Sequence, residues 1–263
     1  MIMADSFVRS EEARQNEFTT DEGDRPLITQ FAAKNVEDFV TAAEMVYPYC
    51  DGVDLNCGCP QRWAIQEGVG SCLLRKPENI YDLVSQLRNR LHKPFSVSVK
   101  IRLQPDIKRT VELCRGLERC GVTFVSVHAR TPAQRKQPAD HEALSLLTSA
   151  CPSLPIVANG DVNSLEIAER LHSETKCRGV MSARAILRNP GLFQGHARTP
   201  KSCVDAWLPI AVSAGCSYNC LHHHLEFMLE SRLSPSEKRL LHSLNCIPAL
   251  MHFLENTNIF DRD

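Results

Sequence analysis

The sequence has no long hydrophobic run, and this absence excludes a helix that could cross a membrane. No stretch of the 263 residues approaches the length of about 18 apolar residues that a bilayer span needs. The N-terminal segment MIMADSFVRSEEARQ mixes acidic and basic side chains and contains no apolar core of a secretory signal. We therefore expect a globular protein of the cytoplasm, with the nucleus as an alternative compartment.

Metal-binding cysteine pairs are also missing. The chain has 12 cysteines, but none of them form the Cys-x-x-Cys spacing of zinc and iron–sulfur sites. Without a secretion signal, so many cysteines indicate free thiols in a reducing compartment. A metal site would have only Cys216, Cys220 and the histidines at 222–224 to build on. We expect these histidines to form the polar face of an amphipathic helix, and we predict no metal.

The sequence also lacks the glycine-rich motif of dinucleotide-binding folds, since no Gly-x-Gly-x-x-Gly follows an apolar run. Short runs rich in valine and isoleucine alternate with amphipathic segments instead. The runs are residues 26–31, 52–57, 95–102, 124–130, 155–161 and 179–185. Their nearly continuous hydrophobicity is typical of strands buried on both faces of a parallel sheet. Six successive βα units predict an α/β fold of the TIM (β/α)8 barrel type rather than a doubly wound sheet.

The amphipathic segments predict helices between the strands and a change of architecture near the C-terminus. Pro77 suits the first position of a helix, and Asn163 with Glu166 has the spacing of a capping box that opens a helix through Leu171. After about residue 200 the pattern is helical throughout. We expect a barrel domain over residues 1–195 and a small all-helical domain over residues 196–263.

Polar side chains stand at the end of every predicted strand. They are Gln30, Asn56, Lys100, His128, Asn159 with Asp161, and Arg184. Ordinary loop starts would explain one or two of them, but not all six. Because the carboxyl ends of barrel strands form the catalytic face, this pattern favours an enzyme.

The charge of the chain is nearly balanced, with 30 Lys and Arg against 31 Asp and Glu, but it is unevenly distributed. Residues 62–136 contain 15 basic and 6 acidic side chains. A local basic excess suits a polyanion such as nucleic acid, because phosphate contacts are local. Solvated helix faces are the alternative explanation, and charge alone does not decide between the two.

Residues 55–77, LNCGCPQRWAIQEGVGSCLLRKP, carry the most specific signal. A strand-end Asn-x-Gly-Cys-Pro, a glycine-containing loop and a Lys-Pro helix start resemble the signature of the tRNA-dihydrouridine synthases. The segments VSVKIR, HART, ANGD and GVMSARA resemble the later blocks of that family in the same order. The wording CGCPQRW is most similar to the eukaryotic subfamily that acts at tRNA positions 20a and 20b.

The resemblance implies an FMN-dependent oxidoreductase that reduces the C5–C6 bond of a uridine in the D loop of tRNA. NADPH or NADH would be the reductant. Cys59 would be the acid that protonates the base, since a thiol is largely protonated at neutral pH. Cys57 would serve packing only. The tRNA base must leave its stack to enter the site, and the free energy of unstacking is lowest for bases in single-stranded loops.

The resemblance also assigns the remaining candidate residues. Flavin contacts would come from Gln30, Lys100 and His128, and the phosphate would lie against Asn159, Gly160, Asp161, Ala183 and Arg184. Asn56, Arg102 and Arg62 would contact the substrate. A cation such as Lys100 has a physical reason to lie near the flavin, because it stabilises the anionic reduced ring.

The sequence departs from the family pattern at its start. The family opens with a strand ending in Ala-Pro-Met, whereas residues 1–7 resemble only the end of the second strand. We therefore expect a barrel that lacks its first strand or strands, with weakened FMN binding and stability. Two other functions stay open: a catalytically impaired form that only binds tRNA, and another FMN barrel enzyme related to dihydroorotate dehydrogenase.

Overall fold

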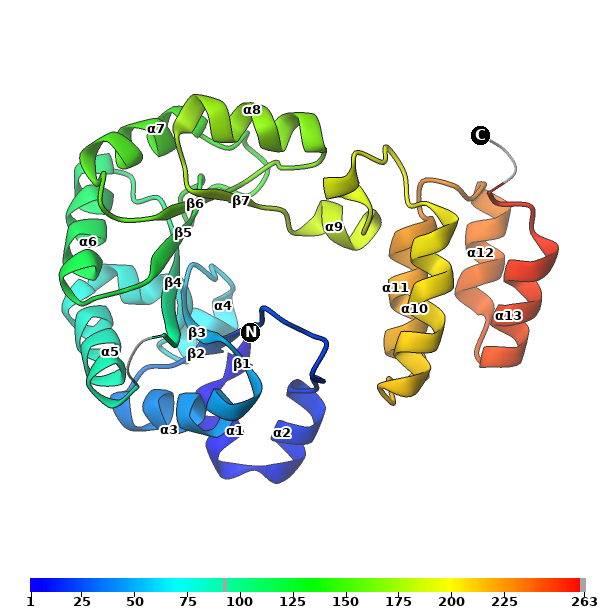
Figure 1. Ribbon diagram of the computed structural model, residues 1–263, viewed down its shortest axis with the longest axis horizontal. Coiled ribbons are helices and arrows are strands. Elements are labelled where there is room, and N and C mark those ends of the chain that lie inside the picture. Colours follow the sequence, from blue (N-terminus) through cyan, green and yellow to red (C-terminus); the bar gives the residue numbers. More distant parts are fainter. Residues whose placement is uncertain (92–93, 261–263) are drawn as a thin grey trace. The chain divides into compact units, whose positions relative to one another are not determined.

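The computed structural model describes residues 1–91 and 94–260 and contains one parallel sheet (Figure 1). Seven strands follow one another across it in chain order. They are β1 (Ile2–Met3), β2 (Ile28–Ala32), β3 (Gly52–Cys57), β4 (Ser96–Arg102), β5 (Phe124–His128), β6 (Ile156–Asn159) and β7 (Gly179–Met181). This order of parallel strands with helical crossovers is the arrangement that the βα repeats predicted.

The part of the chain before β7 contains the helices α1 (Ala4–Arg9), α2 (Glu11–Glu17), α4 (Arg62–Gln66) and α8 (Leu165–Thr175). It also contains α3 (Val36–Val46), α5 (Pro77–Arg90), α6 (Ile107–Arg119) and α7 (His141–Ala150), which lie along the outer side of the sheet (Figure 1). The apolar side chains of β3 and β4 that point toward them, such as Leu55, Val99 and Ile101, are fully buried. This layer supplies the hydrophobic burial that holds the sheet and its helices together.

The strands alternate between polar and apolar residues, which corrects the continuous pattern expected from the sequence. In β4, Val97, Val99 and Ile101 point outward, and Ser98 and Lys100 point to the opposite face. The register sets Asn56 directly beside Lys100. Since side chains on neighbouring strands share a face when they are in register, the inner face of the sheet is polar. That polar face is what positions the candidate site.

Local sequence determines where the helices begin. Pro77 is the first residue of α5, as predicted, and the Asp106 side chain caps α6 by accepting from the Lys108 N–H at 3.0 Å. The predicted cap of α8 is wrong by one residue. Ser164 Oγ, and not Asn163, accepts a hydrogen bond from the Ile167 N–H at 3.2 Å.

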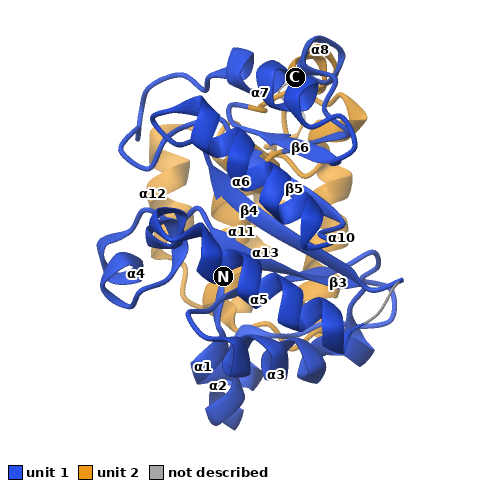
Figure 2. Ribbon diagram, turned by 90° about the vertical axis from the view of Figure 1, so that its left-hand side faces the viewer, with its two compact units in different colours: residues 1–161, 171–181 blue, residues 162–170, 182–263 orange. Residues whose placement is uncertain are grey.

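The chain divides into two compact units, which Figure 2 colours separately. The first contains residues 1–161 and 171–181, and the second contains residues 162–170 and 182–263. The second unit includes α9 (Arg184–Arg188), α10 (Lys201–Ser213), α11 (Tyr218–Leu229), α12 (Pro235–Ser243) and α13 (Ile247–Asn256). The domain boundary between residues 195 and 196 stays a prediction.

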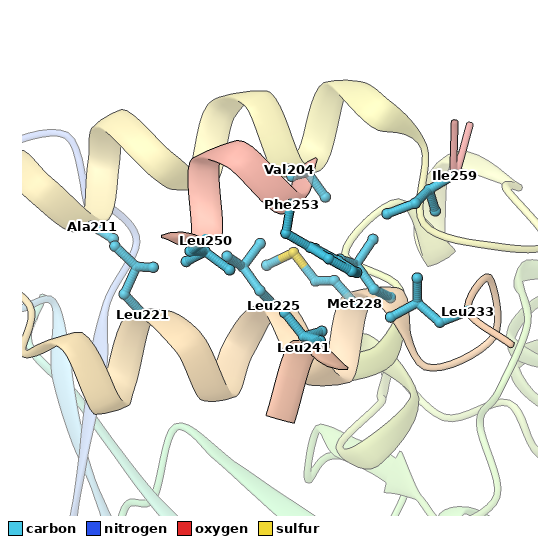
Figure 3. Packing of buried hydrophobic residues seen from close by; sticks show 11 residues of the cluster. Val204, Ala211, Leu221, Leu225, Met228, Leu233, Leu241, Leu250, Phe253 and Ile259 are labelled. Atoms are coloured by element: carbon cyan, nitrogen blue, oxygen red, sulfur yellow. The ribbon is translucent and has the colours of Figure 1, made fainter. Parts of the chain in front are cut away.

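The second unit has a hydrophobic core of its own. Side chains from α10, α11, α12 and α13 meet in it (Figure 3). Its buried members are Val204, Ala211, Leu221, Leu225, Met228, Leu229, Leu233, Leu241, Leu250, Phe253 and Ile259. The helices predicted for this part of the sequence therefore pack as a small bundle.

The histidines at 222–224 do not share one polar face. His222 is buried, with Nε2 2.8 Å from the Leu241 carbonyl oxygen, whereas His223 is exposed beside Glu226. Across residues 1–91 and 94–260, no group of His, Cys, Asp or Glu side chains could hold a metal ion. Within the same residues, no helix is long and apolar enough to span a bilayer.

Candidate active site

The loop after β3 is held by the side chain of Asn56, the residue before the end of the strand. Asn56 Oδ1 accepts hydrogen bonds from the Gly58 N–H at 3.1 Å and the Cys59 N–H at 3.0 Å. Asparagine commonly closes a turn in this way, because its side chain takes the place of a backbone acceptor. One residue of the strand therefore closes the turn that follows it and sets the position of Cys59.

A second segment, the 3₁₀ helix η2 (Gly70–Arg75), packs directly against this loop. The Ser71 N–H donates to the Cys59 carbonyl oxygen at 2.9 Å. Gly70 has a φ of +71°, and a Cβ there would lie only 2.7 Å from the same oxygen. Glycine is therefore required for η2 to approach the Cys59 backbone.

The two cysteines of the motif differ in burial. Cys57 is fully buried, and burial raises the pKa of its thiol well above the ordinary value. Cys59 is partly exposed, beside Met3 and the buried side chains of Ala32, Ala64 and Val69. The structure therefore keeps Cys57 in the packing, as expected, whereas Cys59 packs against this small apolar cluster and stays partly exposed.

A buried polar network lies on the inner face beneath this loop. Gln30 accepts from Asn56 Nδ2 at 2.8 Å and donates to an oxygen of Asp54 at 2.7 Å. The other oxygen of Asp54 accepts from the Ser98 hydroxyl at 2.7 Å. Burial raises the pKa of Asp54 to about 6, although hydrogen bonds from Ser98 and Gln30 and the charge of Lys100 oppose the rise.

Lys100 extends this network to the neighbouring strands. Its Nζ donates to Asn159 Oδ1 at 3.1 Å, and Asn159 Nδ2 donates to the Met181 carbonyl oxygen at 2.9 Å. Burial lowers the pKa of Lys100, while the Asp54 carboxylate raises it and Arg102 lowers it further. Asn159 is itself buried, so its amide fixes where the ammonium group lies.

Arg102, at the end of β4, ties two loops together. Its Nε donates to the Gly58 carbonyl oxygen at 2.9 Å, and Nη1 donates to the Thr131 carbonyl oxygen at 3.1 Å. The guanidinium therefore braces the Cys59 loop against the loop that follows β5. This is a local, structural contact of a residue that we expected to contact the substrate.

His128 is held as a neutral imidazole. Its Nε2 lies 3.2 Å from Nη1 of Arg130, and because a guanidinium can only donate, Nε2 accepts and Nδ1 carries the proton. Burial lowers the pKa of His128 to about 3, together with the charges of Arg102, Lys100 and Arg130. Arg130 also binds both oxygens of Asp161, at 2.8 and 2.7 Å.

The geometry brings most of the predicted residues to one place. A cysteine on a braced loop, a half-buried lysine, a neutral histidine and two amides lie at the carboxyl ends of β2–β6. The family model for dihydrouridine synthase (Dus) matches residues 1–258. The chain belongs to the dihydrouridine synthase family.

Relatives within the family are similar along nearly the whole chain. A Mus musculus protein named "tRNA-dihydrouridine(20a/20b) synthase [NAD(P)+]-like" is 46% identical over 255 residues, which cover 97% of this chain and 78% of that protein. The Homo sapiens protein of the same name is also 46% identical, with 80% of its length covered. In Saccharomyces cerevisiae, "tRNA-dihydrouridine(20a/20b) synthase [NAD(P)+]" is 34% identical over 267 residues, 100% of this chain and 73% of that protein.

The fold also has a neighbour among solved structures. The crystal structure of DHODH in complex with ferulenol from Eimeria tenella superimposes with a TM-score of 0.52 and 14% identity, over 73% of this chain and 61% of that chain. At this identity the likeness concerns the fold alone. Together with the seven parallel strands, it confirms the predicted α/β fold of the TIM-barrel type.

Some residues expected from the Dus resemblance lie outside this network. Arg62 is exposed at the start of α4. Ala183 and Arg184 belong to the second unit, where Arg184 begins α9 instead of ending a strand. Gly160 follows β6, with its carbonyl oxygen 3.1 Å from His141 Nε2. Their roles stay predictions.

Two residues that the sequence analysis missed are central to the network. Asp54 precedes Asn56 by two residues, and this spacing alone places both on the same face of β3. Arg130 is buried and joins His128 to Asp161. Reading the strands as alternating would have revealed Asp54. The position of Arg130 depends on a partner 31 residues away, which no local pattern indicates.

Proposed function

We propose that this protein is an FMN-dependent tRNA-dihydrouridine synthase that reduces the C5–C6 bond of a uridine in the D loop. The proposed uridine is at position 20a or 20b, with NADPH or NADH as the reductant. The observation that carries the proposal is the partly exposed Cys59 on a loop fixed by Asn56, which is in register with the half-buried Lys100. The names of the relatives with 46% identity support the same reaction.

The residues of the inner face fit a flavin. The hydroxyl oxygen of Ser126 is buried and has no hydrogen-bond partner among the described residues, and Ser126 lies directly beside Lys100 in the register. A neighbouring ammonium, two side-chain amides and a neutral histidine can serve the carbonyl and ring nitrogen atoms of an isoalloxazine. Gln30, Lys100 and His128 would hold the ring, and bound FMN would supply the hydride.

Lys100 contributes its positive charge. Negative charge on a reduced flavin is stabilised by a nearby cation, and the contact with Asn159 holds the ammonium group at one place on the inner face. His128 contributes a donor rather than a charge, because its neutral form carries the proton on Nδ1 while Nε2 accepts from Arg130. The neutral form of His128 is therefore the one that the assignment requires.

Cys59 contributes the proton. Its thiol would protonate C5 of the uracil as hydride reaches C6, so the C5–C6 double bond becomes a single bond and a thiolate remains. Three contacts orient the loop for this transfer: the Asn56 turn, the Ser71 N–H on the Cys59 carbonyl, and Arg102 on the Gly58 carbonyl. A proton from solvent restores the thiol before the next turnover.

Replacing Cys59 by alanine tests the proposal. We expect Cys59→Ala to lower the rate of dihydrouridine formation about 10²- to 10⁴-fold, the usual contribution of a positioned acid. Affinity for tRNA should not change, since the loop keeps its backbone contacts. The assay is dihydrouridine in D-loop tRNA after incubation with NADPH, compared with Cys120→Ala, a partly exposed cysteine at the end of α6.

Two results would contradict the proposal. If the wild-type protein binds tRNA but forms no dihydrouridine when supplied with FMN and NADPH, it acts only as a tRNA-binding protein. If Cys59→Ala and Cys120→Ala reduce tRNA at the same rate as the wild type, the thiol is not the acid.

A further inference from the structure

A cavity of about 620 Å³ lies in the first unit at the carboxyl end of the sheet. Its lining comes from α4, η2, the beginnings of α5 and α6, and the loops that follow β4 and β5. Helices α5 and α6 lie side by side on the sheet (Figure 1). Its volume falls within the range of about 300–1,000 Å³ that small-molecule pockets occupy.

The cavity shares its walls with the candidate active site. Ser71, on one wall, donates its N–H to the Cys59 carbonyl oxygen at 2.9 Å. Thr131, on another wall, accepts from Arg102, which also binds the carbonyl oxygen of Gly58. A ligand in the cavity therefore touches the two segments that hold the Cys59 loop.

Two arginines in the lining have guanidinium groups that are available to bind a ligand. Arg75 and Arg109 are both exposed, and neither guanidinium makes a hydrogen bond or an ion pair with any residue in the described ranges 1–91 and 94–260. Glu112 is the one carboxylate among the lining residues. Guanidinium groups in such a position are suited to bidentate binding of phosphate oxygens.

An aromatic ring forms a rigid apolar wall. Tyr81 of α5 lies so close to the backbone of α6 that a Cβ added at Gly116 would be 2.2 Å from the ring carbon Cζ. The ring therefore rests directly on the neighbouring helix. Pro77, Pro105 and Pro132 add further flat apolar surface to the lining. Flat apolar and aromatic surfaces are what a purine base packs against.

We propose that this cavity binds the adenosine-phosphate portion of the NAD(P)H reductant. Arg75 and Arg109 would bind its phosphates, and Tyr81 would pack against the adenine ring. The proposal rests on the proposed function, which requires a dinucleotide with its nicotinamide at the neighbouring site. A nucleotide of the tRNA has the same chemistry. The compact volume and mainly apolar lining favour a small ligand, since RNA strands follow open charged grooves.

The test is direct titration of adenosine 2′,5′-bisphosphate into the FMN-loaded protein by calorimetry. We expect the double variant Arg75→Gln, Arg109→Gln to bind this probe at least about tenfold more weakly than the wild type, because charge-assisted hydrogen bonds to phosphate are lost. The KM for NADPH should rise by a similar factor while tRNA affinity stays within about twofold. Arg119→Gln, an exposed arginine on the same helix but outside the lining, should match the wild type.

Each outcome decides a separate question. Equal binding of the probe to wild type and double variant, or no binding to the wild type, overturns the assignment. A loss of tRNA affinity with unchanged NADPH kinetics also overturns it and assigns the cavity to an RNA nucleotide. Absence of dihydrouridine formation by the wild type counts against the proposed function. The probe titration tests nucleotide binding by the cavity independently of that result.

Discussion

At the scale of single residues, the buried carboxyl of Asp54 makes the stability of the folded protein depend on pH. Asp54 is buried on the inner face, where it accepts hydrogen bonds from Gln30 and Ser98. The negative charge of its carboxylate raises the pKa of Lys100. Its pKa is raised from 3.8 to about 6, so the folded protein holds a proton between these values that the unfolded chain has released. Asp54 therefore makes the folded state less stable as pH rises through this window.

We predict that Asp54→Asn removes this pH dependence. The rise from 3.8 to about 6 corresponds to about 3 kcal/mol, so the free energy of unfolding of the wild type should fall by roughly that amount relative to Asp54→Asn between pH 4 and pH 7. Urea unfolding of both proteins across this range measures the difference. A difference that stays constant with pH would show that Asp54 does not titrate as a buried carboxyl.

Asp51 provides the matched control. Its pKa is lowered, chiefly by the hydrogen bond from the Leu27 N–H and also by Arg25. A carboxyl with a lowered pKa stabilises the folded state above its ordinary pKa, and this contribution is lost as pH falls. Asp51→Asn should therefore change the pH dependence of stability in the opposite direction to Asp54→Asn.

At the scale of elements, close contacts between backbones decide how the sheet is assembled. β3 lies between β2 and β4, with Gly52 in register with Ile28 on one side and Ser96 on the other. A Cβ at Gly52 would come 2.5 Å from the Ser96 carbonyl oxygen. Backbone atoms cannot move aside as the end of a flexible side chain can, so a larger residue here must separate the strands.

We predict that Gly52→Ala destabilises the protein by about 1–3 kcal/mol, the usual cost of forcing a methyl group into a packed position. Gly179, the first residue of β7, is the control, because a Cβ there would meet only Val157 Cγ2 at 3.9 Å. Gly179→Ala should be neutral or slightly stabilising. Thermal unfolding of both variants makes the comparison, and equal melting temperatures would contradict the prediction.

At the scale of the whole molecule, the charge distribution matters more than the net charge of −1. The basic excess of residues 62–136 lies within the first unit, which also contains the candidate site. Part of it is internal: Lys100, Arg102 and Arg130 have partners in the network. Exposed residues such as Arg135 and Lys136 remain for contacts with phosphates.

We predict strongly salt-dependent tRNA binding despite the near-neutral net charge. Two phosphate contacts are enough to lower affinity about tenfold between about 50 and 200 mM salt. The double variant Arg135→Ala, Lys136→Ala should reduce the slope of log affinity against log salt by up to about two. Arg90→Ala is the control, since Arg90 is paired with Glu44 at 2.5 Å. Filter binding across a salt series gives the slopes, and an unchanged slope in the double variant would exclude these two contacts.

The sequence by itself determined the strands, the order of βα units and the position of the Cys59 motif. These follow from local patterns: apolar runs bounded by loops, Pro77 at a helix start, and an Asn-x-Gly-Cys-Pro run whose asparagine closes its own turn. The tertiary structure decided which polar residues meet. Asp54 with Ser98, Arg102 with Gly58 and Arg130 with Asp161 are pairs 31–44 residues apart. Their contacts depend on strand register, and a slip of one residue would turn each side chain to the opposite face.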